Sequence, residues 1–135
     1  LKYEQEMGID NIEIYLDFAE KVKTNRSVLR KTLFDLKNEG KSVVALGAPV
    51  KGSTLINYCN LTESEIKCGV EINPHKCGTY FPGTKIPVYH QDDIEPPDYF
   101  LLLSWNFKDE IISKIKPILN KGTKLIVPIP FPEII

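Results

Sequence analysis

The chain has 135 residues, of which 42% are hydrophobic and 26% are charged, a composition typical of one globular domain and unlike that of disordered, collagen-like or low-complexity chains. Seventeen basic and eighteen acidic residues leave a formal net charge of −1, which argues against partners as strongly anionic as nucleic acid or an acidic membrane surface. We therefore expect no nucleic-acid partner and no membrane partner.

The chain begins with Leu1 rather than methionine, without a secretory signal, and no apolar run approaches the ~20 residues of a membrane span. We expect a fragment of a longer polypeptide that functions in the cytoplasm. Cys59, Cys68 and Cys77 form no Cys-x-x-Cys pair, so neither a disulfide framework nor a zinc site is indicated and reduced thiols are favoured.

Apolar residues recur at helical spacing through residues 1–40, a stretch without proline. The pattern predicts one long helix, or two in tandem with a break in the polar stretch 23–27. Asp10 is the expected N-cap, and Gly40 is the expected glycine just past the helix end. We interpret the acidic early turns and basic later turns as a solvated face that suits the helix dipole.

Beyond residue 40, short apolar runs predict buried parallel strands, with helices between them. The strands are expected at residues 42–46, 66–72, 99–104 and 124–127, with a shorter one at 86–89. The helices are expected at 53–59 and 107–120, the second shifted or kinked near Pro117.

This alternation predicts an α/β fold, namely a Rossmann-like, three-layer, doubly wound and mainly parallel sheet preceded by the long helix. We expect a single structural domain. Residues 1–40 form its helical lead-in, which packs on the Rossmann-like residues 41–135.

The turn after the first predicted strand, residues 47–52, is the main candidate for an anion site, because it aims backbone amides and the positive end of a helix dipole at one point. Lys51 adds a charge, Gly52 allows a ligand to approach, and Ser53 or Thr54 either caps the helix or donates to a phosphate oxygen. The turn is neither a Walker A loop nor a regular dinucleotide fingerprint, because its lysine precedes the glycine and a proline replaces the second glycine.

Further candidates follow the second and fourth predicted strands, at the carboxyl edge where open α/β sheets bind ligands. Glu71 stands where such folds place an acidic residue on a ribose hydroxyl, although a solvated carboxylate is the alternative, and Trp105 alternatively packs under the next helix. Candidates for ligand contact at this edge are Asn73, His75, Lys76, Tyr80, Trp105 and Asn106. No spacing indicates a triad, an acid–base pair or a metal site, so we predict no catalytic or metal-ligating residue.

Residues 47–59, 73–88, 105–107 and 126–130 together resemble the C-terminal domain of S-adenosylmethionine-dependent sugar C-methyltransferases. The four segments occur in the family's order, and the long leading helix resembles the family's lead-in to this domain. Glu71 stands where the family is expected to have aspartate, and Cys77 stands where it more usually has glutamine.

The resemblance implies a domain that holds a nucleotide-linked ketosugar against an upstream methyl-donor domain of the same chain. S-adenosylmethionine, a structural zinc and the base that deprotonates the sugar carbon are then expected outside this chain, which is not catalytic by itself. Lys51 and the helix that starts near Gly52 would hold the diphosphate. The substrate contacts that we expect are Lys51, Gly52, Ser53, Thr54, Asn57, Glu71, Asn73, Lys76, Tyr80, Trp105 and Asn106.

Two alternatives stay open for the same residues. The first is an independent Rossmann module that binds NAD or coenzyme A at the same edge. The second is a scaffold domain with a vacant turn, whose long helix docks onto neighbouring domains.

Overall fold

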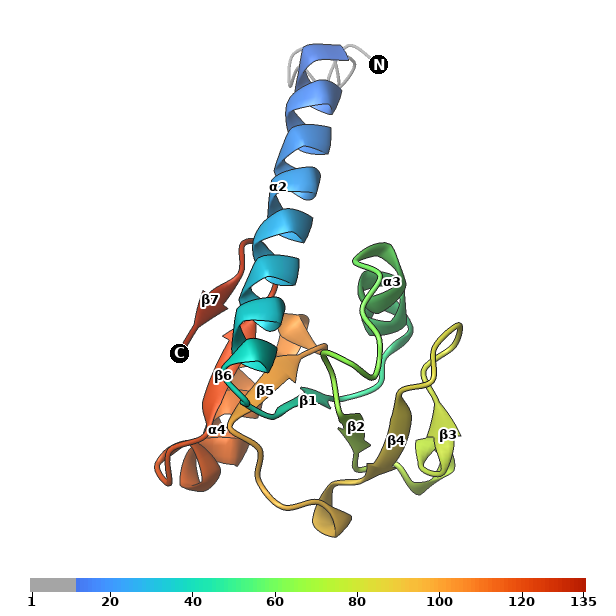
Figure 1. The fold of residues 1–135 in the computed structure, drawn as a ribbon, viewed down its shortest axis with the longest axis vertical. Coiled ribbons are helices and arrows are strands. Elements are labelled where there is room, and N and C mark those ends of the chain that lie inside the picture. The colour runs from blue at the N-terminus through green and yellow to red at the C-terminus, as the bar shows by residue number, and fades with distance from the viewer. Residues whose placement is uncertain (1–11) are drawn as a thin grey trace.

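The computed structural model describes residues 12–135, so the expected N-cap Asp10 lies outside the described part. Helix α2 (Ile12–Asn38) is continuous through residues 23–27, which selects the single helix among the two arrangements expected (Figure 1). It ends as predicted at Gly40, which has a φ of 74°. The amides of Gly40 and Lys41 donate to the carbonyls of Lys37 and Leu36, a pairing typical of a Schellman cap.

A seven-stranded sheet follows the helix, in the order β3-β4-β2-β1-β5-β6-β7. Its parallel strands are β1 (Val43–Leu46), β2 (Cys68–Glu71), β4 (Pro87–His90), β5 (Tyr99–Leu102) and β6 (Lys124–Val127). The antiparallel edges are β3 (Thr79–Tyr80) and β7 (Glu133–Ile134). The chain winds outward from β1 to one side and then from β5 to the other, which makes the gap between β1 and β5 the topological switch point. This topology confirms the predicted Rossmann-like fold.

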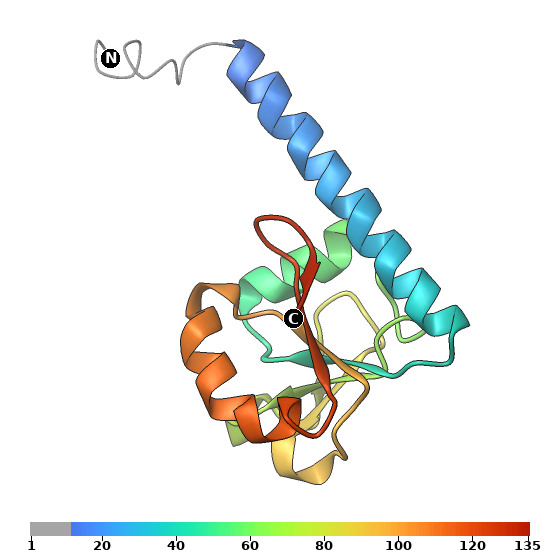
Figure 2. The same ribbon diagram turned by 90° about the vertical axis from the view of Figure 1, so that its left-hand side faces the viewer.

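Helices cover both faces of the sheet, as Figure 2 shows in side view. Successive strand residues point to opposite faces, and all four residues of β1 are buried. Ala45 packs with Leu29 of α2 and Ile56 of α3 (Val50–Tyr58) in one core cluster. Val44 packs with Ile115 of α4 (Lys108–Leu119) in the other. The predicted three layers are therefore present.

Several boundaries differ from the predicted ones. The strands predicted at 66–72 and 99–104 are shorter, and the loop expected at 73–84 contains the 3-10 turn η1 (Pro74–Lys76) and the edge strand β3. Two-residue edge strands such as β3 and β7 are too short to produce a period-two pattern in the sequence. Helix α3 begins at Val50 rather than near residue 53, directly after Pro49 in the N-cap position.

Helix α2 is anchored to the sheet only along its second half. Asn25, which is buried, donates hydrogen bonds from Nδ2 to the carbonyl oxygens of Pro128 at 2.8 Å and Pro130 at 3.0 Å. The turns before Asn25 project beyond the sheet (Figures 1 and 2). None of the helices within residues 12–135 combines the length and hydropathy that a bilayer crossing requires.

Candidate functional site

A solvent-open cavity of about 680 Å³ lies between α3 and the β3–β4 side of the sheet, a size suited to a small-molecule ligand. The outer face of α3 forms one wall, and the segment around β3 forms the other. The lining residues are Ala48, Val50, Ser53, Thr54, Asn57, Tyr58, Lys76, Thr79, Tyr80, Phe81, Pro82 and Val88.

The first turn of α3 begins at this cavity. The amides of Gly52 and Ser53 both donate to the Pro49 carbonyl, at 3.0 and 3.2 Å. Those of Val50 and Lys51 have no acceptor among residues 12–135. Unpaired amides at a helix start, together with the helix dipole, favour a negatively charged group nearby.

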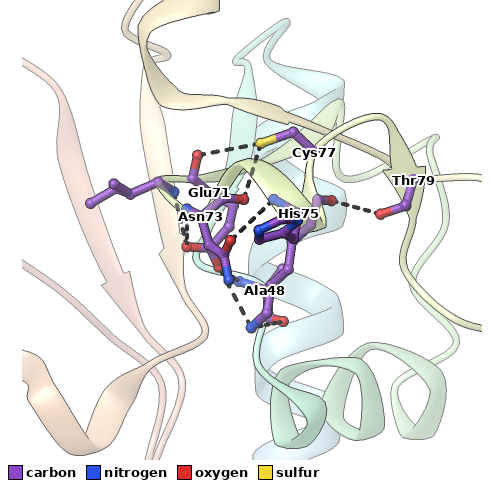
Figure 3. A network of polar contacts seen from close by, with 8 residues as sticks. Ala48, Glu71, Asn73, His75, Cys77 and Thr79 are labelled. Atoms are coloured by element: carbon purple, nitrogen blue, oxygen red, sulfur yellow. Dashed lines mark hydrogen bonds and ion pairs between the residues drawn. The ribbon is translucent and has the colours of Figure 1, made fainter.

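Glu71 ends β2 and joins the β1–α3 turn to the loop after β2 (Figure 3). Its Oε2 accepts from the Ala48 amide at 3.1 Å, and its Oε1 accepts from the Ile72 and Asn73 amides at 2.9 and 3.3 Å. Lys76 Nζ lies 3.9 Å from Oε2 and donates to the Ala48 carbonyl at 3.3 Å. Contact between Glu71 and a sugar hydroxyl stays a prediction, because the described partners of the carboxylate are all within the protein.

The predicted cradle of turn amides is therefore only partly open. Gly47 has a positive φ of 88°, and its amide donates to the Val70 carbonyl at 2.9 Å. The Ala48 amide already holds the Glu71 carboxylate. The anion-binding capacity that is left comes from the helix start at Val50 and from Lys76.

Two residues of the predicted turn have other neighbours. Gly52 is buried, and a Cβ on it would lie 2.8 Å from Leu103 Cβ, so its missing side chain lets α3 pack on the end of β5. Lys51 points to the other flank of α3, where its Nζ lies 5.1 Å from the centroid of the Trp105 ring, a cation–π distance. Trp105 packs partly against the core.

The expectation that Ser53 or Thr54 caps α3 is wrong. Pro49 occupies the N-cap position, and no side chain caps the helix. Thr54 Oγ1 donates back to the Val50 carbonyl at 3.3 Å. Both hydroxyls line the cavity instead.

The predicted site residues thus fall into separate groups. Ser53, Thr54, Asn57, Lys76 and Tyr80 line the cavity. Asn73 belongs to the Glu71 network, where its Oδ1 also accepts from the His75 amide at 3.0 Å. Lys51 and Trp105 pair on the far flank of α3, and Asn106 is exposed in the 3-10 turn η3 (Trp105–Phe107).

Sequence reasoning missed Tyr58, Thr79 and Phe81 as cavity residues. Tyr58 has a signal that identifies it, since it lies one helical turn after Thr54 on the same face of α3. Thr79 and Phe81 come from the short β3 segment, which the sequence pattern did not reveal.

A second, smaller crevice of about 170 Å³ lies at the switch point, where doubly wound folds bind nucleotide cofactors. Gly47, Glu71, Gln91 and Ser104 contribute to it. A Cβ on Gly47 would lie 2.7 Å from Ser104 Oγ, so the ends of β1 and β5 are close together. This crevice is smaller than the several hundred Å³ typical of small-molecule sites.

The titratable side chains of the described cavity lining are Tyr58, Lys76 and Tyr80. Among the described lining residues none is an Asp, Glu, His or Cys. The buried thiols Cys59 and Cys68 lie outside the cavity, and burial raises the pKa of each, which makes them poor nucleophiles. Within residues 12–135 no group of three His, Cys, Asp or Glu side chains is placed to hold a metal ion.

Comparison with known proteins confirms the resemblance to a C-methyltransferase C-terminal domain. The family described as the C-methyltransferase C-terminal domain matches residues 1–130. The C-methyltransferase NovU of Streptomyces niveus is 36% identical over 137 residues, covering 100% of this chain and 33% of that protein. The chain thus spans about a third of this relative's length. It belongs to the family of C-methyltransferase C-terminal domains.

Proposed function

We propose that this chain is the substrate-binding C-terminal domain of a cytoplasmic, S-adenosylmethionine-dependent C-methyltransferase that acts on a nucleotide-linked ketosugar. The cavity beside α3 takes the nucleotide end of that substrate, with its diphosphate at the helix start. One observation carries the proposal: the start of α3, with its unpaired Val50 amide, and the Lys76 ammonium lie at one cavity, and Lys76 is the one charged residue of the described lining.

The chemistry of the cavity supports a ligand that is part anionic and part aromatic or sugar-like. Lys76 is its one charged residue among the described lining, so a negative group is favoured near it. The hydroxyls of Ser53 and Thr54 and the rings of Tyr58 and Tyr80 supply hydrogen bonds and stacking surfaces for a neutral heterocycle or sugar.

The rest of the reaction is assigned to the remaining two thirds of the parent enzyme. S-adenosylmethionine, the structural zinc and the general base are assigned there, as the family resemblance implies, and the crevice of about 170 Å³ at the switch point is smaller than most small-molecule sites. Val50 and Tyr80 are 86% and 62% exposed at the cavity mouth. This exposure of apolar surface supports the proposal that an upstream methyl-donor domain covers the mouth. The isolated chain should therefore bind weakly.

Amide chemical shifts of the isolated chain, recorded during titration with a nucleotide-diphosphate sugar, test the proposal. We expect the largest shifts at Val50, Ser53, Thr79 and Tyr80, and a weakening of about tenfold in Lys76→Ala, since an ammonium–phosphate bond contributes about 1.5 kcal/mol.

The exposed Lys121 provides the matched control, because Lys121→Ala removes the same charge far from the cavity. Shifts that spare the start of α3, or equal weakening in both variants, would contradict the proposal. Thermal stabilisation by NAD or coenzyme A, without any response to nucleotide sugars, would instead support the cofactor-binding alternative. The small volume at the switch point argues against that result.

A further inference from the structure

The first turns of α2 expose apolar side chains with no partner among the described residues. We call residues 12–24 the overhang. Ile12, Leu16 and Phe18 are 70%, 60% and 66% exposed, and Tyr15 is 54% exposed. The overhang projects beyond the sheet in both ribbon views (Figures 1 and 2). Exposed apolar side chains gathered on one element mark an interaction surface more often than solvated surface.

Tyr15 and Phe18 continue the face that α2 uses to pack on the sheet, whereas Leu16 lies about 140° around the helix from Leu29, on the charged side. Leu29 and Leu33 are fully buried on that face. At 3.6 residues per turn, Phe18 and Val22 fall on the same side of the helix as Leu29. The apolar face of α2 therefore continues for about three turns toward the N-terminus beyond Asn25, where the sheet no longer covers it.

The other side of the overhang is suited to water. Asp17 and Lys21 form an ion pair at 3.0 Å, and Glu20 and Lys23 form one at 3.6 Å, all with highly exposed side chains. The overhang is thus amphipathic, as expected of a helix that has one partner and one solvated face.

The C-terminal end of the chain adds apolar surface where the overhang begins. Asn25 donates hydrogen bonds to the carbonyls of Pro128 and Pro130, which fixes the loop between β6 and β7 against α2. Phe131 and Ile134, directly after it, are 53% and 48% exposed. Strand β7, which contains Ile134, is also an edge of the sheet, and open edges are places where another surface can pair.

We infer that the overhang docks against the catalytic remainder of the parent methyltransferase. The relative NovU is about three times as long as this chain, which covers 33% of it, so two thirds of such an enzyme lie outside the matched region. In a C-terminal domain the N-terminal end of the chain joins it to that remainder, and the overhang is at that end. The inference rests on the proposed function insofar as the chain is taken as one part of a longer methyltransferase.

Thiol labelling tests this docking. Phe18→Cys places a thiol on the apolar face, and Glu20→Cys places one on the solvated face of the same turns. Both positions are exposed, so neither substitution removes a core contact. Each variant is made in the isolated chain and in the full-length polypeptide that contains it, and the unsubstituted proteins give the background rate of the partly exposed Cys77.

We expect the Phe18→Cys thiol to react about tenfold more slowly in the full-length enzyme than in the isolated chain, because access governs thiol reactivity. The Glu20→Cys thiol should react at similar rates in both. Equal Phe18→Cys rates in both proteins would overturn the inference. Slow, concentration-dependent labelling of the isolated chain, with a dimer in sedimentation, would also overturn it in favour of a second copy. Labelling needs no sugar nucleotide, so its outcome is independent of the substrate proposal.

Discussion

Glu71 is the residue on which the shape of the candidate site most depends. Its carboxylate accepts from three backbone amides and lies 3.9 Å from Lys76 Nζ, so it orients the cation that faces the cavity. Its position at the end of β2 predicts a ribose contact, which stays a prediction, and a sequence cannot show that three backbone amides surround the carboxylate. Side-chain identity predicts capacity for hydrogen bonding, whereas the partner depends on which backbone groups the fold leaves unpaired.

Glu71→Gln should lower the free energy of unfolding by about 1–2 kcal/mol, because it removes the charge from a largely buried acceptor and can turn an amide N–H toward the Ala48 N–H. Urea denaturation measures the change. Glu63→Gln, at an exposed position outside the network, is the control and should be neutral. Equal stability of the two variants would contradict the role assigned to Glu71.

Gly69 makes a second residue-scale prediction, because a Cβ there would lie 2.4 Å from Cε2 of the buried Phe81 ring. Gly69→Ala should destabilise the protein by about 1–3 kcal/mol through overpacking. Adding Phe81→Leu makes room, so the double variant should be more stable than the sum of the two single changes predicts. Simple additivity in urea denaturation would show that the ring does not restrict position 69.

At the scale of elements, Asp98 and Ser42 join the starts of β5 and β1. Asp98 Oδ2 accepts from the Ser42 amide at 2.8 Å and from its hydroxyl at 3.1 Å, and the Asp98 amide donates to Ser42 Oγ at 2.9 Å. The two strands pair in parallel from Val43 and Tyr99 onward. This reciprocal contact therefore sets the register at the end of the sheet opposite the candidate site.

The Ser42 hydrogen bonds lower the pKa of Asp98 below its ordinary value of 3.8. The unfolded chain then binds a proton at Asp98 before the folded one does. Its stabilising contribution is complete above the ordinary pKa and is lost as the pH falls through the lowered one. The unsubstituted protein should lose free energy of unfolding between pH 6 and pH 3, and Asp98→Asn should make this loss smaller. The difference between the urea midpoints at the two pH values measures the loss in each protein. The same shift in both proteins would contradict this linkage.

The main elements were predictable because their apolar runs are long enough to show a period. Strand β6 has the predicted bounds, and the segment 107–120 contains α4. Strands β3 and β7 have two residues each, so pairing with β4 and β6 defines them and local sequence does not. The start of α3 was placed too late because hydroxyls at 53 and 54 look like caps, whereas Pro49 precedes the first turn.

At the scale of the whole molecule, the candidate site lies at the predicted carboxyl edge of the sheet but is divided by α3. Helical phase explains the division, since residues two apart point about 200° apart around the axis. Lys51 faces Trp105 on one flank, and Ser53 and Asn57 line the cavity with Lys76. The sequence predicted which residues gather at the edge, but their grouping required the orientation of α3.

The joint, by which we mean the hydrogen bonds from Asn25 of α2 to the loop after β6, is a long-range contact whose contribution to stability can be measured. Asn25→Ala leaves the carbonyls of Pro128 and Pro130 without their donor, so the free energy of unfolding should fall by about 1–3 kcal/mol. Asn38→Ala, at the exposed last residue of α2, is the control and should change stability by less than about 0.5 kcal/mol. Similar values for both variants in urea denaturation would show that the joint contributes little.

Calorimetric titration of the isolated chain with a nucleoside diphosphate and with its parent nucleoside tests the central claim most directly. We expect the diphosphate to bind at least about tenfold more tightly than the nucleoside, and we expect Lys76→Ala to remove most of this difference while Lys121→Ala preserves it. Equal affinities for diphosphate and nucleoside, or a difference that persists without the Lys76 ammonium, would contradict it.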